Sequence, residues 1–107
     1  LILGVAYKRD VNDSRESPAF EIVDLLIKKG ALVTYHDPFI PNMKTDNFSL
    51  ASARLTPSLI KAQDAVLILT DHSTFDWDKI VTHCRLLFDT RNATKNVEKG
   101  SGKIARL

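Results

Sequence analysis

Two cationic side chains, Lys8 and Arg91, are the residues of this sequence best suited to bind a charged ligand, because each comes at the end of an apolar segment. A lysine ammonium is a mobile point charge, whereas an arginine guanidinium is a planar fork that can bind two oxygens at once. Side by side, the two would suit a diphosphate. The alternative is that each is a solvated surface charge, or forms a salt bridge with Asp10 or Asp89.

The apolar segments that position these cations have the pattern of strands in a parallel sheet. Residues 1–7 are apolar except for Gly4 and do not alternate with polar residues, which is typical of a strand covered on both faces. Further strands are predicted over 31–36, 65–70 and 86–89, with helices over 18–29, 57–63 and 77–84 between them. This alternation implies right-handed crossovers. We therefore predict an α/β three-layer sandwich, Rossmann-like or flavodoxin-like, with a parallel sheet of four or five strands and helices on both faces.

Three local signals mark helix ends. Ser17 and Thr56 are each followed by a proline, so each predicts an N-cap and a first helical residue that needs no N–H donor. Gly30 predicts the end of the first helix.

Ligands of open parallel sheets bind beyond the carboxyl ends of the strands, near the point where the strand order reverses. With the order 2-1-3-4, the first and third strands flank that point and the fourth lies next to the third, so Lys8 and Arg91 could meet one ligand. The four strand ends carry Tyr7-Lys8-Arg9, His36-Asp37, Thr70-Asp71-His72 and Asp89-Thr90-Arg91-Asn92.

The first strand is not followed by a dinucleotide fingerprint. That fingerprint needs G-x-G-x-x-G between strand and helix, and Gly4 is the only glycine before Gly30. Asp37, at the end of the second strand, is interpreted as a turn former with Pro38. This domain should therefore not be the one that binds the NAD pyrophosphate.

Cysteine and histidine do not point to a catalytic or metal centre. Cys84 is predicted to be buried as a small apolar residue, because its neighbours on a helix point in other directions. The three histidines lack ligand-like spacing with it, so no metal site and no catalytic residue are predicted. Trp77 is predicted to be a core anchor.

Composition limits the class of protein. The chain has 107 residues, enough for one core, with 44% apolar and 26% charged residues. The net charge of +2 is too small and too dispersed to indicate a nucleic-acid partner. The longest apolar run, residues 65–69, is too short to span a membrane, and one cysteine cannot form an internal disulfide. We expect a cytoplasmic domain.

Some segments carry little signal. The sequence opens without Met inside a strand-like run, as expected of a single domain cut from a larger enzyme. Residues 40–55 look irregular, with one short piece of unassigned type. The tail after residue 92 is predicted to be loop and frayed end, with Ile104 as its main apolar anchor.

Several motifs together resemble one known family. G-V-A-Y-K, then D-x-x-D-x-R-E-S-P-A and Y-H-D-P, stand at the start, and AVLILTDHSTFDW and LLFDTRN follow later. Over about residues 1 to 92 the chain resembles the C-terminal, UDP-sugar-binding domain of the UDP-glucose/GDP-mannose dehydrogenase family.

The resemblance implies a two-step NAD-dependent oxidation of a sugar C6 alcohol to the carboxylate. It implies that NAD is bound mainly by an N-terminal domain and that the catalytic cysteine lies upstream of this domain. This sequence contains neither the N-terminal domain nor the central helical region that follows it. By the same similarity, Tyr7, Lys8 and Arg91 correspond to substrate contacts, and Arg15 to an arginine that reaches NAD.

The motif A-Y-K, with V-N-D-S-R-E-S-P and T-Y-H-D-P, is more similar to the UDP-N-acetylhexosamine dehydrogenases, acting on UDP-GlcNAc or UDP-ManNAc, than to the UDP-glucose branch. The full enzyme is expected to be a homo-oligomer that serves polysaccharide biosynthesis. The alternatives are a UDP-glucose 6-dehydrogenase domain and a stand-alone, non-catalytic nucleotide-binding module. A receiver-like signalling domain would need acidic residues after the first strand, where this chain has Tyr7-Lys8-Arg9.

Overall fold

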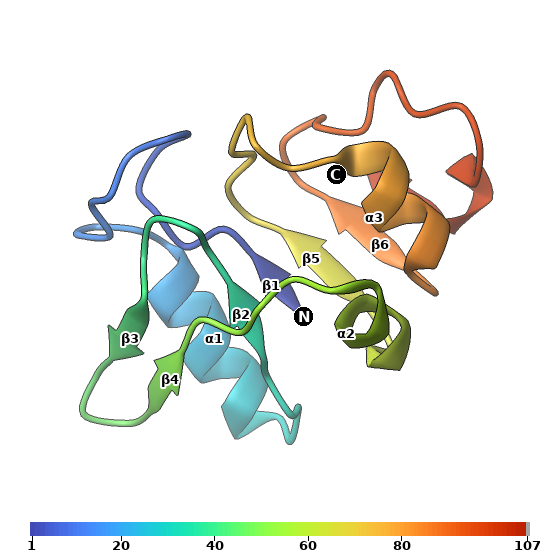
Figure 1. Ribbon diagram of the computed structural model, residues 1–107. Coiled ribbons are helices and arrows are strands. Elements are labelled where there is room, and N and C mark those ends of the chain that lie inside the picture. Colours follow the sequence, from blue (N-terminus) through green and yellow to red (C-terminus); the bar gives the residue numbers. More distant parts are fainter. Residues whose placement is uncertain (107) are drawn as a thin grey trace.

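Five parallel strands form the central sheet of the protein. The structure, a computed structural model, describes residues 1–106 (Figure 1). The strands are β1 (Ile2–Leu3), β2 (Tyr35–His36), β5 (Val66–Ile68), β6 (Leu87–Asp89) and β7 (Ile104–Arg106), in the order β2-β1-β5-β6-β7. The chain runs from β1 to β2 on one side and then returns to β5 on the other side of β1. The predicted order 2-1-3-4, in which the first and third predicted strands flank the reversal, is confirmed.

Helices cover both faces of this sheet. On one face, α1 (Ala19–Lys28) packs on Ile2 and Tyr35. On the other, α2 (Pro57–Ala62) and α3 (Trp77–His83) pack on Leu3, Ile68 and Leu87. Because side chains alternate along a strand, neighbouring residues of β1 enter different cores. The predicted α/β three-layer sandwich is confirmed.

The helix signals are largely confirmed. Thr56 caps α2, because its hydroxyl oxygen accepts a hydrogen bond from the Leu59 N–H at 3.1 Å. Gly30 follows the end of α1 in a left-handed conformation (φ +93°). The start of α1 differs by one residue, because Pro18 occupies the cap position and the Ser17 hydroxyl accepts from the Ala19 N–H at 3.2 Å.

Two segments have more structure than the sequence predicts. Residues 40–55 contain an antiparallel hairpin, β3 (Asn42–Lys44) and β4 (Ser49–Ala51), whose Met43 is fully buried against the α1 side of the molecule. The prediction of a frayed tail is wrong: a short 3-10 helix (Ser101–Lys103) leads into β7, which pairs with β6. Ile104, the predicted anchor, lies opposite Leu87 in this pairing.

The first strand ends earlier than its apolar run predicts, because Gly4 turns the chain. Gly4 has φ +83°, and a Cβ atom there would lie 2.7 Å from the Thr70 nitrogen. The chain after β1 therefore passes directly against the end of β5, and the Thr70 hydroxyl donates to the Ala6 carbonyl at 2.8 Å. Val5 and Ala6 are buried without being part of a strand.

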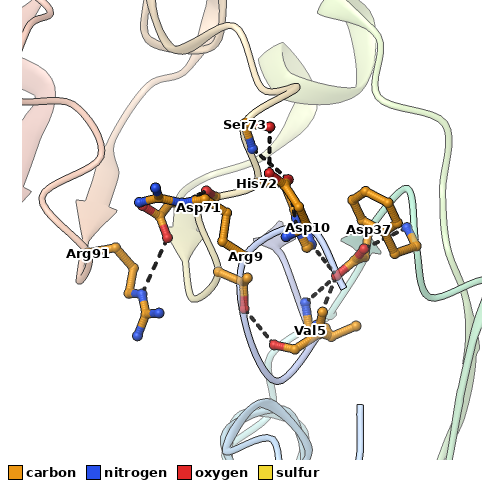
Figure 2. A network of polar contacts seen from close by, with 11 residues as sticks. Val5, Arg9, Asp10, Asp37, Asp71, His72, Ser73 and Arg91 are labelled. Carbon is orange, nitrogen blue, oxygen red and sulfur yellow. Dashed lines mark hydrogen bonds and ion pairs between the residues drawn. The ribbon is translucent and has the colours of Figure 1, made fainter. Parts of the chain in front are cut away.

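A buried carboxylate, Asp37, joins the loops that follow β1, β2 and β5. Its Oδ2 atom accepts hydrogen bonds from the N–H groups of Val5 (2.8 Å) and Ala6 (2.9 Å) and lies 2.9 Å from His72 Nε2. Its Oδ1 atom accepts from the Phe39 N–H at 2.8 Å, which forms the turn predicted at this aspartate. Figure 2 shows these contacts converging on one side chain.

His72 extends this network to the loop after β1. Its Nδ1 atom accepts the Asp10 N–H at 2.8 Å, so its Nε2 atom carries the proton and donates to Asp37. The Asp10 carboxylate in turn accepts from the Ser73 N–H at 2.9 Å. Through Asp10, the loop after β1 is thus tied to both His72 and Ser73 of the loop after β5.

Replacing Gly4 with Ala should reduce the free energy of unfolding by about 3 kcal/mol, because the new methyl group overlaps the Thr70 backbone and the left-handed φ is strained. Gly30→Ala is the matched control. Gly30 has φ +93° with nothing within 4 Å of an added Cβ, so it should cost about 1 kcal/mol. Urea denaturation measures both, and equal losses would contradict the close approach at Gly4.

Asp37→Asn should destabilise the fold by about 2–4 kcal/mol at pH 7, because an amide nitrogen would face buried N–H donors. Burial alone would raise the pKa of Asp37, but hydrogen bonds from Val5, His72, Phe39 and Ala6 lower it below the ordinary 3.8. A carboxyl group with a lowered folded-state pKa stabilises the fold above that ordinary value, and this stability is lost as the pH falls through the folded pKa.

The difference in unfolding free energy between the wild type and Asp37→Asn should therefore shrink as the pH is lowered below the ordinary carboxyl pKa of 3.8 and through the lowered pKa of folded Asp37. Denaturant titrations at a series of pH values measure it. Asp64→Asn, at a fully exposed side chain, is the control and should change little at any pH. A difference that stays constant with pH would refute the assignment of this carboxylate as ionised in the fold.

Candidate anion-binding site

The carboxyl edge of the sheet carries a cationic cleft between the loops that follow β1, β5 and β6, which all emerge at the upper edge in Figure 1. The cleft has a volume of about 320 Å³. Arg9 comes from the loop after β1, and Arg91 and Lys95 come from the segment after β6. The residues that line it are Arg9, Asp71, His72, Ser73, Trp77, Arg91, Asn92, Ala93 and Lys95. Three cationic side chains thus share a cleft with one carboxylate, so it favours an anionic ligand.

Asp71 lies between the two guanidinium groups of this cleft. Arg9 donates from Nε to the Asp71 carbonyl oxygen at 3.0 Å and from Nη2 to the carboxylate, and this pairing raises the pKa of Arg9. Arg91 Nε lies 3.6 Å from the other carboxylate oxygen, too far for a hydrogen bond. The Asp71 side chain is only 9% exposed, whereas those of Arg9 and Arg91 are 61% and 45% exposed. Both guanidinium groups therefore keep donors available to a ligand (Figure 2).

A second buried carboxylate, Asp89, fixes the loop that carries Arg91. Its Oδ1 atom accepts the N–H groups of Arg91 (3.0 Å) and Ala93 (3.1 Å). Its Oδ2 atom accepts from the Thr94 N–H at 2.8 Å and from the Thr94 hydroxyl at 2.6 Å. Burial opposes the charge on Asp89, but these bonds lower its pKa below the ordinary value. Asp89 therefore positions the backbone of Arg91 and does not pair with its guanidinium.

Lys8 and Tyr7 lie outside the cleft that Arg91 lines. The Lys8 side chain is exposed, and its Nζ atom lies 5.5 Å from the centroid of the Tyr7 ring, which is 46% exposed. The structure therefore does not bring Lys8 and Arg91 to one cavity among residues 1–106. The cation that shares the cleft with Arg91 is Arg9, one residue further along. The roles of Tyr7, Lys8 and Arg91 as substrate contacts stay predictions.

Sequence reasoning missed Arg9 and Asp71, although both belong to strand ends that it identified. The sequence signal that could have identified them is their position at predicted strand ends, which lie at the same edge of a parallel sheet. What selected Arg9 over Lys8 is the conformation of the loop after β1, which depends on the contacts of Asp10 with His72 and Ser73. No local sequence pattern specifies those contacts.

Arg15 lies on the outer part of the loop after β1 and is 88% exposed. Its guanidinium pairs with Asp13 at 2.9 Å. Hydrogen bonds from the Arg15 side chain and backbone lower the pKa of Asp13 to about 2. Arg15 does not line the cationic cleft, and its contact with NAD stays a prediction.

The remaining candidates have structural environments. Cys84 is 3% exposed, and burial raises the pKa of its thiol, which confirms the buried interpretation. Trp77 packs against Phe75 with ring centroids 5.1 Å apart and also borders the cleft. Among residues 1–106 no three histidine, cysteine or acidic side chains are grouped to hold a metal ion. Within the same range, no helix has the length and apolar character that a membrane crossing requires.

Comparison with known proteins shows that this chain is similar to part of several nucleotide-sugar dehydrogenases. UDP-N-acetyl-D-mannosamine dehydrogenase of Methanococcus maripaludis (strain C7) is 33% identical over 99% of this chain and 26% of its own length. UDP-glucose 6-dehydrogenase of Rickettsia bellii is 34% identical over 88% of this chain and 24% of its own length. The chain thus spans about a quarter of the length of the curated relatives it matches.

Solved structures agree with the sequence matches. UDP-D-ManNAc dehydrogenase of Pyrococcus horikoshii superposes with a TM-score of 0.70 at 26% identity, over 92% of this chain and 23% of its own. The model of one family, described as "UDP-glucose/GDP-mannose dehydrogenase family, UDP binding domain", matches residues 1–96. This match covers both the segment that carries Arg9 and the segment that carries Arg91. The chain therefore belongs to the UDP-glucose/GDP-mannose dehydrogenase family, in its UDP binding domain.

Proposed function

We propose that this chain is the UDP-sugar-binding domain of an NAD-dependent nucleotide-sugar 6-dehydrogenase. The substrate would be a UDP-N-acetylhexosamine, UDP-GlcNAc or UDP-ManNAc, whose C6 alcohol is oxidised to the uronate. The observation that carries this proposal is the cationic cleft at the carboxyl edge of the sheet, in a domain whose family model is described as UDP binding. In open parallel sheets, ligands bind at this edge.

In this function the domain binds and orients the substrate. Arg91 would bind oxygens of the diphosphate with its planar guanidinium, and Lys8 would add a mobile positive charge. Tyr7 would contact the nucleotide sugar at the rim of the loop after β1. Cys84, the only cysteine in the sequence, is buried with a raised thiol pKa, so it is poorly suited to act as the nucleophile of the oxidation. We therefore expect the isolated chain to be inactive.

The residues present fit NAD only at its periphery. NAD, when bound, would accept hydride from the substrate. The loop between β1 and α1 has no G-x-G-x-x-G, and Pro18 at the start of α1 offers no N–H donor. Arg15 is exposed on that loop and could reach a cofactor held elsewhere. The proposal therefore includes an N-terminal NAD domain and a central helical region in a cytoplasmic homo-oligomer.

A second substrate remains in the proposal because relatives of both kinds match this chain. The UDP-N-acetyl-D-mannosamine and UDP-glucose dehydrogenases are 33% and 34% identical to it. The A-Y-K motif favours the N-acetylhexosamine branch. Activity of the full-length protein on several UDP-sugars distinguishes the two substrates.

The non-enzymatic alternative is a stand-alone binding module. It would be favoured if the full reading frame contained neither a G-x-G-x-x-G motif nor a cysteine-bearing helix upstream of this domain.

The isolated chain should bind UDP weakly, with a dissociation constant on the order of 0.1 to 1 mM, and NAD hardly at all. The reason is that its cationic cleft suits a diphosphate, while its first loop lacks the dinucleotide fingerprint. Isothermal titration calorimetry measures both ligands under the same conditions. Tight NAD binding without UDP binding would reverse the assignment.

Exchanging Arg91 for Ala should cost about 1 to 3 kcal/mol of substrate binding in the assembled enzyme, because it would lose a charge-assisted contact with a diphosphate oxygen. Exchanging Lys8 for Ala should cost less, because Lys8 lies outside the cleft and would act through charge attraction. Steady-state kinetics with the UDP-sugar measures this as a rise in KM. Lys61→Ala, an exposed lysine in the last turn of α2, is the control. If neither change raised KM, both cations would be surface charges without a role in binding.

A further inference from the structure

The geometry points to Arg9 as a second diphosphate-binding guanidinium, held in place by Asp71 and acting opposite Arg91. This inference rests on the proposed function and deepens it, because it names the residue pair that binds the diphosphate of the nucleotide. The evidence is the shared cleft, the two contacts that anchor Arg9 and the donors that remain available.

Arg9 is anchored in a way that leaves part of its guanidinium available. Its Nε–H donates to the Asp71 carbonyl oxygen at 3.0 Å, and one Nη2–H donates to the Asp71 carboxylate. A guanidinium has five N–H donors, so about three remain for a ligand in the cleft. The side chain is 61% exposed, so these donors are accessible. Arg9 therefore combines a fixed orientation with unused donors.

The backbone at Arg9 is also fixed. The next residue, Asp10, has φ +60° and donates its N–H to His72 Nδ1 at 2.8 Å. Its carboxylate accepts from the Ser73 N–H at 2.9 Å and from the Ser73 hydroxyl at 2.6 Å. A cation that is ordered before binding loses less conformational entropy on meeting its ligand than a free lysine does. Within residues 1–106, Lys8 forms no side-chain hydrogen bond or salt bridge and lies only over the Tyr7 ring, so it has no such anchor.

Arg91 completes the pair from the other side of Asp71. Its Nε atom lies 3.6 Å from Asp71 Oδ1, so the attraction is electrostatic and its donors are not committed to that carboxylate. One carboxylate offsets only one of the two guanidinium charges. The excess positive charge matches a diphosphate bridge, whose oxygens two planar forks can bind together.

Trp77 provides a probe of this cleft. It is the only tryptophan of the chain, and it lines the same cleft as Arg9 and Arg91. Its fluorescence in the 107-residue chain should therefore change when UDP is added. Arg9→Ala should weaken UDP binding about tenfold, the effect of losing one charge-assisted contact. Arg9→Lys should restore only part of the affinity, because an ammonium cannot make both Asp71 contacts and still present a fork.

A control variant and a second ligand, uridine, distinguish diphosphate binding by Arg9 from an effect of net charge alone. Arg85→Ala removes the same charge from another exposed ion pair, with Asp64, just before β6 at the opposite edge of the sheet. It should leave UDP affinity unchanged. Uridine, which has no phosphate, should bind the wild type and Arg9→Ala equally. Circular dichroism and thermal unfolding confirm that each variant is folded.

Asp71→Asn tests whether Asp71 positions Arg9, because positioning and simple charge attraction predict opposite changes in UDP affinity. Removing a negative charge from a cationic cleft would strengthen UDP binding if only net charge mattered. If Asp71 orients Arg9, the same change should weaken UDP binding severalfold.

The outcomes distinguish the two proposals. A wild-type chain that fails to bind UDP would overturn the proposed function, and this inference with it. Weakened binding by Arg91→Ala together with unchanged binding by Arg9→Ala would leave the proposed function intact and refute the role of Arg9 alone. Tighter UDP binding by Asp71→Asn would refute the positioning role of Asp71.

Discussion

The buried carboxylate of Asp37 is the interaction on which the arrangement of the site depends. It lies at the end of β2 yet accepts N–H groups from Val5 and Ala6, after β1, and from His72, after β5. A buried charge is stable only when its hydrogen bonds are satisfied, and here each oxygen of the group has a donor. Three loops that are distant in sequence are thereby fixed around one side chain, which determines where their outer residues point.

Elsewhere at this edge of the sheet, buried carboxylates likewise fix the loops while cationic side chains are exposed. Asp89 is buried and binds backbone N–H groups, whereas Arg91, two residues later, is exposed. Asp71 is nearly buried and pairs with the exposed Arg9. Carboxylates thus organise the loops from inside, and cations extend from those loops into solvent. A chain whose net charge is only +2 can in this way present a locally cationic cleft.

The sequence specifies the layers of this fold better than its edges. The central strands and the helices can be predicted from local apolar patterns. Their apolar residues are buried in the core regardless of which elements pack beside them. The strand β7 was missed because an edge strand pairs on one side only and carries one strong anchor, Ile104. Strand β1 was predicted too long, because the close approach of Gly4 to Thr70 involves residues 66 positions apart. For the same reason the strand ends could be identified from sequence, but Arg9 could not be chosen over Lys8.

The different anchoring of Lys8 and Arg9 has a consequence for binding. Arg9 and Arg91 are tied through Asp71, so on our proposal they define one location for the diphosphate. Lys8 is exposed and, among the described residues, contacts only the Tyr7 ring, so its long side chain can approach the ligand only by giving up conformational freedom. Its contribution would therefore come mainly from charge attraction, which salt screens, whereas the contribution of the paired guanidinium groups would depend on geometry and persist at higher ionic strength.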